Sequence, residues 1–294
     1  MTSSSLKRSL LLLLFLLLGL TACLPDLVPA ATATLTPTLT PTVTPIQLAV
    51  TINGEGITQE EFDAELARYL HAQAELGITV SQEEATQVVL DDFIDQTLLA
   101  QNAVLSGYIV DESALQARID ALAAQVGGAE ALAAWQADNG YTEAGFRSAL
   151  RRQMAAAWMR DQIIASVPTS DEQVHVMQIL FYNADDAQTV YALLQSGWDF
   201  NAVAEQYDPL TKGELGWFPR GYLDHPSIEE AAFALQPGEY STVVESSVGF
   251  HILYLVERDP ARPLSPDALL TLQESALQDW LTQQRNESTI VIAP

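Results

Sequence analysis

The sequence predicts an α+β protein in which a helical domain, built from N- and C-terminal segments, carries an inserted α+β domain with a small antiparallel sheet. Apolar residues recur at helical spacing over residues 58–166 and again over 265–285. The segment between these two stretches alternates in hydrophobicity and is rich in strand formers. The length of 294 residues leaves room for two domains and a leader.

The leader, residues 1–22, has the features of a bacterial lipoprotein signal peptide. Lys7 and Arg8 form a positive region, and the apolar run Leu10–Leu20 has signal-peptide length but is too short for a membrane span. Small residues then precede Cys23, which resembles a lipoprotein cleavage site. The resemblance implies lipidation at Cys23 and an extracytoplasmic, lipid-anchored protein. The alternative is a plain secretory signal with an incidental cysteine.

Residues 23–46 are rich in threonine and proline, with Pro37, Pro41 and Pro45 evenly spaced. Proline disfavours regular helix and sheet, so an extended tether is expected. At about 3.1 Å per residue, such a tether could hold the folded part about 60 Å from the membrane. A flexible linker with no length requirement fits the same composition.

The helical domain is expected over residues 47–167. Residues 48–52 alternate as a short strand, and Asn53, Gly54 and Gly56 predict a turn after it. Thr58 with Glu61, and Ser81 with Glu84, form capping boxes that predict the starts of two helices, and further helices are expected over residues 111–125 and 142–166.

The inserted domain is expected over residues 168–260, with the order strand, two helices, strand, helix and two strands. Residues 261–294 are expected to form a helix and a strand that pack back on the N-terminal domain. The helix has an apolar stripe that cannot remain solvated alone, and residues 288–292 could pair with the strand at 48–52.

Residues 174–258 resemble a parvulin-type (PpiC, rotamase) peptidyl-prolyl isomerase domain. The resemblance is carried, in the order of the family, by "QILF", "GWDFNAVAEQY", "KGELGWFPRGYL", "IEEAAFALQPGEYSTVV" and "GFHILYLVER". The opening strand, turn and capped helix and the terminal helix resemble the helical chaperone part of SurA- and PrsA-like foldases. The resemblance implies a parvulin domain inserted in a SurA-N-like domain.

The resemblance also implies a substrate groove for the proline ring. Leu215, Leu223 and Ile228 fall on its apolar positions, and Phe218 belongs to the same binding region, where with Trp217 it packs beneath. For Phe218, packing rather than substrate contact is the alternative.

Polar residues of the implied site lie on the strands and on one loop. His251 matches the histidine of the final strand, and Ser246 matches the usual threonine or serine. Gln178 replaces the histidine of the first strand, which leaves the level of activity open. Asp208 is the best match for the cysteine or aspartate of a shortened loop, and His175 is expected to point elsewhere. Without the resemblance, His251 would be interpreted as a core histidine.

Composition excludes several classes of function. Thirteen basic residues against 38 acidic ones give a net charge of −25, which argues against nucleic-acid binding. No phosphate-binding glycine loop, histidine pair at metal spacing or nucleophile elbow is present, so we expect no nucleotide, metal or other cofactor. His71 and His225 lack motif context and are expected on the surface.

The function expected from the resemblance is that of a membrane-anchored foldase. It would catalyse cis–trans isomerisation of X-Pro bonds and bind unfolded or extended exported polypeptides that contain proline. The alternative is a holdase chaperone whose parvulin domain is catalytically weak or inactive. A purely structural scaffold has no positive motif in its favour.

Overall fold

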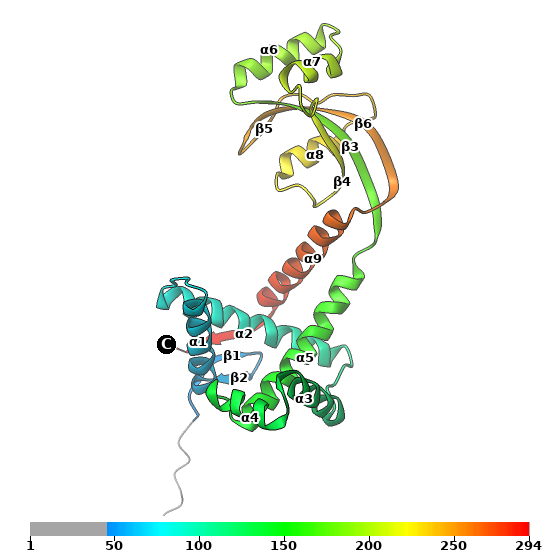
Figure 1. Cartoon of the computed structure of the whole chain (residues 1–294). Coiled ribbons are helices and arrows are strands. Elements are labelled where there is room, and N and C mark those ends of the chain that lie inside the picture. Colours follow the sequence, from blue (N-terminus) through cyan, green and yellow to red (C-terminus); the bar gives the residue numbers. More distant parts are fainter. Residues whose placement is uncertain (1–45, 294) are drawn as a thin grey trace, which may run out of the picture. The chain divides into compact units, whose positions relative to one another are not determined.

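The structure is a computed structural model that describes residues 46–293. The expected signal peptide, Cys23 and the expected tether up to Pro45 lie outside the described residues. The secondary structure confirms the α+β class (Figure 1). None of the helices within residues 46–293 is both long and apolar enough to cross a membrane.

The helical part contains α1 (Gln59–Glu75), α2 (Gln82–Leu105), α3 (Glu112–Val126), α4 (Ala129–Asp138), α5 (Glu143–Ser166) and α9 (Pro266–Glu287). The Thr58 and Ser81 side chains cap α1 and α2 by accepting hydrogen bonds from backbone amides three residues later, as the capping boxes predicted. Helix α4 is not predicted by the sequence patterns, because it follows Gly128 and has no side-chain cap.

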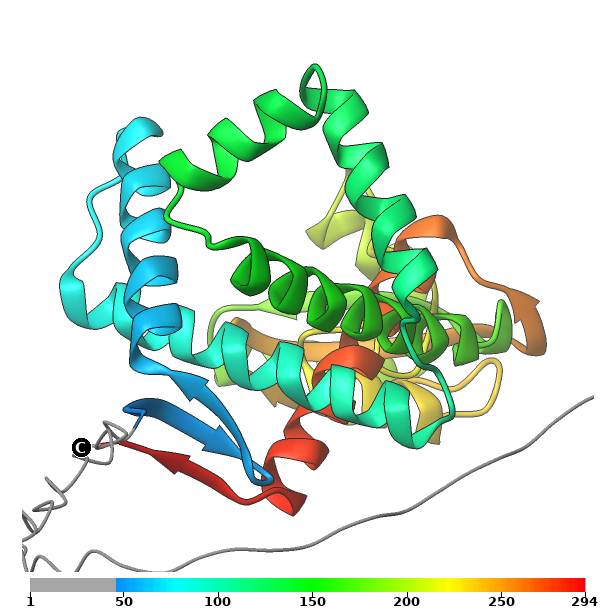
Figure 2. The same cartoon turned by 90° about the horizontal axis from the view of Figure 1, so that it is seen from below.

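A three-stranded sheet in the order β2-β1-β7 joins the two ends of the described chain (Figure 2). It consists of β1 (Leu48–Ile52), β2 (Glu55–Thr58) and β7 (Ile290–Ile292), and β1 pairs antiparallel with both neighbours. The pairing expected for the C-terminal strand is therefore confirmed. The turn is shorter than expected: Asn53 and Gly54, both at positive φ, close the hairpin, and Gly56 lies within β2.

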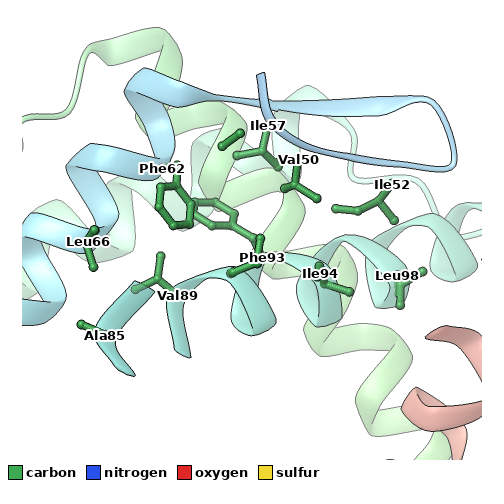
Figure 3. Packing of buried hydrophobic residues seen from close by; sticks show 12 residues of the cluster. Val50, Ile52, Ile57, Phe62, Leu66, Ala85, Val89, Phe93, Ile94 and Leu98 are labelled. Atoms are coloured by element: carbon green, nitrogen blue, oxygen red, sulfur yellow. The ribbon is translucent and has the colours of Figure 1, made fainter. Parts of the chain in front are cut away.

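The first core lies between this hairpin, α1 and α2 (Figure 3). Val50, Ile52 and Ile57 point from the strands onto the helices and are almost fully buried. Phe62 of α1 meets Phe93 of α2 with ring centroids 6.2 Å apart. A second core forms among α3, α4 and α5, centred on Leu115, Phe146 and Leu150.

Helix α9 docks on the helical part through the predicted apolar stripe. Leu277 and Trp280 belong to the group that packs against a small cluster formed by Leu99, Ala156 and Ile163. Farther along the same half of the helix, Arg285 donates to Asp91 and Asp95 at 2.6 Å each. These carboxylates raise the pKa of Arg285 above its ordinary range.

The inserted part is a four-stranded antiparallel sheet in the order β4-β3-β6-β5. The strands are β3 (Ser170–Phe181), β4 (Glu214–Pro219), β5 (Val244–Ser246) and β6 (Gly249–Pro263). Helices α6 (Ala184–Gln195) and α7 (Phe200–Tyr207) cover one face, and α8 (Pro226–Ala234) covers the other (Figure 1). Strands β3 and β6 continue as a paired ribbon to Ser170 and Pro263, beyond residues 174–258, over which the family resemblance runs.

Candidate active site

Strand β6 places the predicted histidine on the face of the sheet that α8 covers. Side chains alternate along a strand, and Ile252 packs with α6 and α7 whereas Leu253 and Leu255 pack with α8. By this alternation His251 lies on the α8 side. It is only 2% exposed, so its ring nitrogens need partners within the protein.

The partners of His251 are two of the residues that the sequence proposed for the site. Its Nδ1 lies 2.9 Å from Oε1 of Gln178 on β3, and its Nε2 lies 2.7 Å from Oγ of Ser246 on β5. The backbone N–H of Val248 donates to the same Ser246 hydroxyl at 3.2 Å. Burial lowers the pKa of His251, and the charge of nearby His225 lowers it further. The neutral imidazole is thereby favoured.

The four apolar residues of the expected groove belong to one cluster on the same face of the sheet. Phe218 and Ile228 are 1% and 5% exposed and are members of its core, whereas Leu215 and Leu223 are half-buried and pack against it. A ligand on this face would meet the two leucines first. Phe218 and Ile228 would support them from below, which for Phe218 agrees with the packing alternative.

Gly213 brings the glycine-rich segment close to the first strand. The backbone N–H of Gln178 donates to the Gly213 carbonyl at 2.7 Å. Gly213 has a φ of +78°, and a Cβ built there would lie 2.2 Å from the Gln178 carbonyl oxygen. Only glycine fits such an approach, so this position fixes β4, and with it Leu215, beside Gln178.

The hydrogen bonds of Asp208 keep it within its own loop. Its carboxylate accepts from the backbone amides of Leu210 and Thr211, both at 3.1 Å, and from the Thr211 hydroxyl. These bonds lower the pKa of Asp208, and this carboxylate therefore orders the loop between α7 and β4. No group of three or more His, Cys, Asp or Glu residues suited to a metal ion occurs among residues 46–293.

Two histidines outside the hydrogen-bonded chain differ in their relation to the site. His175 pairs with Glu214 and stacks on Trp217, with the two ring centroids 5.3 Å apart. It therefore points away from His251, as expected. His225 was expected on the surface, yet its Nδ1 lies 3.5 Å from Ser247 Oγ and its charge acts on His251. The signal that could have found it is its place directly before the helix that carries Ile228.

Two family models match the chain. The SurA-like N-terminal domain matches residues 10–160, and the PPIC-type PPIASE domain matches residues 183–257. The first match covers just over half of the 294 residues, and the second lies on the inserted sheet and its helices. The domain that contains His251 is therefore a peptidyl-prolyl isomerase domain of the PPIC type.

The chain is also similar to individual proteins that are named as foldases or peptidylprolyl isomerases. "Foldase protein PrsA" of Caldanaerobacter subterraneus is 40% identical over 89 residues, 29% of this chain and 29% of that protein. The chain thus spans less than a third of the length of that relative. "Foldase protein PrsA" of Clostridium kluyveri is 25% identical over 285 residues, 80% of this chain and 83% of that protein. The crystal structure of a PrsA peptidylprolyl isomerase from Bacillus cereus has 21% identity and a TM-score of 0.44, covering 82% of this chain and 86% of that one.

Proposed function

We propose that this chain, which belongs to the family with the SurA-like N-terminal domain and carries a PPIC-type PPIase domain, is an extracytoplasmic foldase. Its reaction is the cis–trans isomerisation of X-Pro bonds in exported polypeptides. The observation that supports this most is the hydrogen-bonded chain of half-buried Gln178, buried His251 and half-buried Ser246, which lies on the sheet face where Leu215 and Leu223 are partly accessible.

The reaction needs a surface of this kind rather than a nucleophile. Rotation about an amide costs about 18–20 kcal/mol because its resonance is lost. The twisted transition state has less charge separation than the planar amide. An apolar surface that holds the proline ring and removes water from the carbonyl therefore favours the transition state over the substrate. Leu215 and Leu223 supply the apolar contacts, and the neutral His251 chain supplies fixed polar groups.

The remaining parts of the proposal concern location and clients. Cys23 carries the lipid anchor at the start of the tether, residues 23–46. The clients are unfolded or extended chains with proline, and the net charge of −25 favours clients with basic segments.

Cleavage and lipidation are tested by mass spectrometry of the protein from a bacterial membrane. An unmodified thiol at Cys23 there would contradict the anchor.

Isomerisation is tested by nuclear magnetic resonance exchange between the cis and trans forms of an Ala-Leu-Pro-Phe peptide. We expect exchange above background with the mature chain. His251→Ala should lower kcat/KM about tenfold or more, because the hydrogen bonds from His251 to Gln178 and Ser246 are lost. His71→Ala removes an exposed imidazole on α1 and should leave the rate unchanged. No exchange above background at high protein concentration would refute the activity.

A second function, holdase activity of the helical part, is favoured by an open hollow there. The hollow measures about 680 Å³ and lies between the β1–β2 hairpin, α2 and α5. Among its lining residues, Val104 and Leu105 are 55% and 83% exposed. We expect the mature chain to suppress aggregation of an unfolded client, and Leu105→Asp to weaken the suppression without changing isomerisation. Equal suppression by the variant would argue against this surface.

A further inference from the structure

The hydrogen bonds around His251 all run in one direction. The chain begins at the Val248 backbone N–H, which donates to Ser246 Oγ at 3.2 Å. The Ser246 hydroxyl has two acceptors in reach, His251 Nε2 at 2.7 Å and the Gly249 carbonyl at 3.4 Å. The shorter distance is that of a normal O–H donor, whereas the longer one is beyond the usual range. Because Gln178 Oε1 at 2.9 Å from Nδ1 can only accept, a neutral ring leaves Nε2 without a hydrogen, and the hydroxyl hydrogen is assigned to the His251 side.

The direction at Ser246 fixes the tautomer of His251. A neutral imidazole has one protonated and one unprotonated nitrogen. Because Nε2 accepts from Ser246, the hydrogen resides on Nδ1, which donates to Gln178 Oε1 at 2.9 Å. Burial, which lowers the pKa of His251, keeps the ring in this neutral state.

The direction at His251 in turn orients the amide of Gln178. The amide oxygen is held by the ring, so the NH₂ group with its two donors points the other way. Within residues 46–293, no hydrogen bond involves this NH₂ group, and its nitrogen is not among the buried unpaired atoms. Gln178 is half-buried on the sheet face that the apolar cluster shares. The chain of donors thus ends on an amide that is free to donate to a ligand.

We propose that Gln178 is a catalytic residue whose amide N–H donates a hydrogen bond to the X-Pro peptide group as that group twists. The proposal rests on the proposed isomerase function. As resonance is lost, the prolyl nitrogen regains its lone pair and becomes a better acceptor than in the planar amide. A donor already held in place by His251 then stabilises the transition state more than the substrate. The glutamine substitution is thus a working replacement for the family histidine.

Two substitutions test the donor. Gln178→Glu keeps the length of the side chain and an oxygen for His251 but presents no N–H, and Gln178→Met removes both functions. We expect each to lower kcat/KM about tenfold, the scale of one hydrogen bond, with little change in KM. Gln188→Glu adds the same charge on the exposed side of α6, on the opposite sheet face, and should retain wild-type kinetics. Wild-type kcat/KM in Gln178→Glu would overturn the proposal.

The tautomer of His251 tests the proposal without any turnover. In the full mature chain labelled with ¹⁵N-histidine, the His251 signals are identified by their loss in His251→Ala. We expect a protonated Nδ1 and an unprotonated Nε2 at neutral pH. The opposite tautomer would reverse the chain, present the Gln178 oxygen to the ligand and overturn the proposal. An inactive wild type with the expected tautomer would instead refute the isomerase function on which the proposal rests.

Discussion

Gly213 offers the sharpest stability prediction, because its backbone touches the site. In Gly213→Ala the new Cβ would lie 2.2 Å from the Gln178 carbonyl oxygen at a φ of +78°. The left-handed conformation alone costs about 1–2 kcal/mol for an alanine. Relief of the overlap must also separate the backbone nitrogen of Gln178 from the carbonyl oxygen of Gly213, which now lie 2.7 Å apart. The loss of this hydrogen bond adds about 1–3 kcal/mol for a buried unpaired group.

A matched control separates the two costs. Gly197 has a φ of +96°, yet a Cβ there would meet no atom within 4 Å. Gly197→Ala therefore bears only the conformational cost. With a urea dependence of about 1–3 kcal/mol per M, the unfolding midpoint of Gly213→Ala should fall about 1 M below that of Gly197→Ala. Circular dichroism in urea measures both midpoints. Equal midpoints would refute the close approach to Gln178.

Three further predictions concern His251 and α9. His225→Gln should raise the pKa of His251 toward its ordinary value of 6.5 while burial still holds it lower, as histidine resonances followed against pH will show. Because the folded chain binds fewer protons than the unfolded chain just below pH 6.5, wild-type stability should decrease as the pH falls through this window, and less so in His225→Gln. Trp280→Ala should weaken α9 docking by about 2 kcal/mol, less than for a fully buried tryptophan, and speed amide exchange in α9 and β7; unchanged exchange would contradict the docking role. Arg285→Gln should cost about 1 kcal/mol in thermal unfolding, an effect that added salt diminishes.

Local signals in the sequence were sufficient for most of the fold. Capping residues located α1 and α2, and the apolar stripe of the tail required the docking partner that Leu99, Ala156 and Ile163 provide. Helix α4 lacks such a cap, and the local sequence around Gly56 predicts a turn because nothing in it distinguishes a turn glycine from a glycine paired in a strand. Both misses concern positions where tertiary pairing, rather than local chemistry, decides the structure.

The sequence predicts the site residues that lie on strands, but not the side-chain directions of residues in loops. Gln178, Ser246 and His251 lie on three paired strands, so their alignment with the family segments placed them together. Asp208 lies in a loop of altered length, where alignment does not fix direction, and its carboxylate turns to its own loop. His225 approaches the site through the packing of α8, and its place directly before that helix is the only local signal that points to it.

The central claim is that a proline ring binds on the α8 face of the inserted sheet, against Leu215 and Leu223. Nuclear Overhauser contacts between the proline ring protons of a bound Ala-Leu-Pro-Phe peptide and labelled leucine methyl groups test it directly. We predict contacts from the proline ring to both Leu215 and Leu223. In a Leu223→Ala variant the Leu223 contacts should disappear, and the Leu215 contacts should remain. Proline contacts confined to Leu194, on the opposite face, or to Leu105 of the helical part would contradict the account.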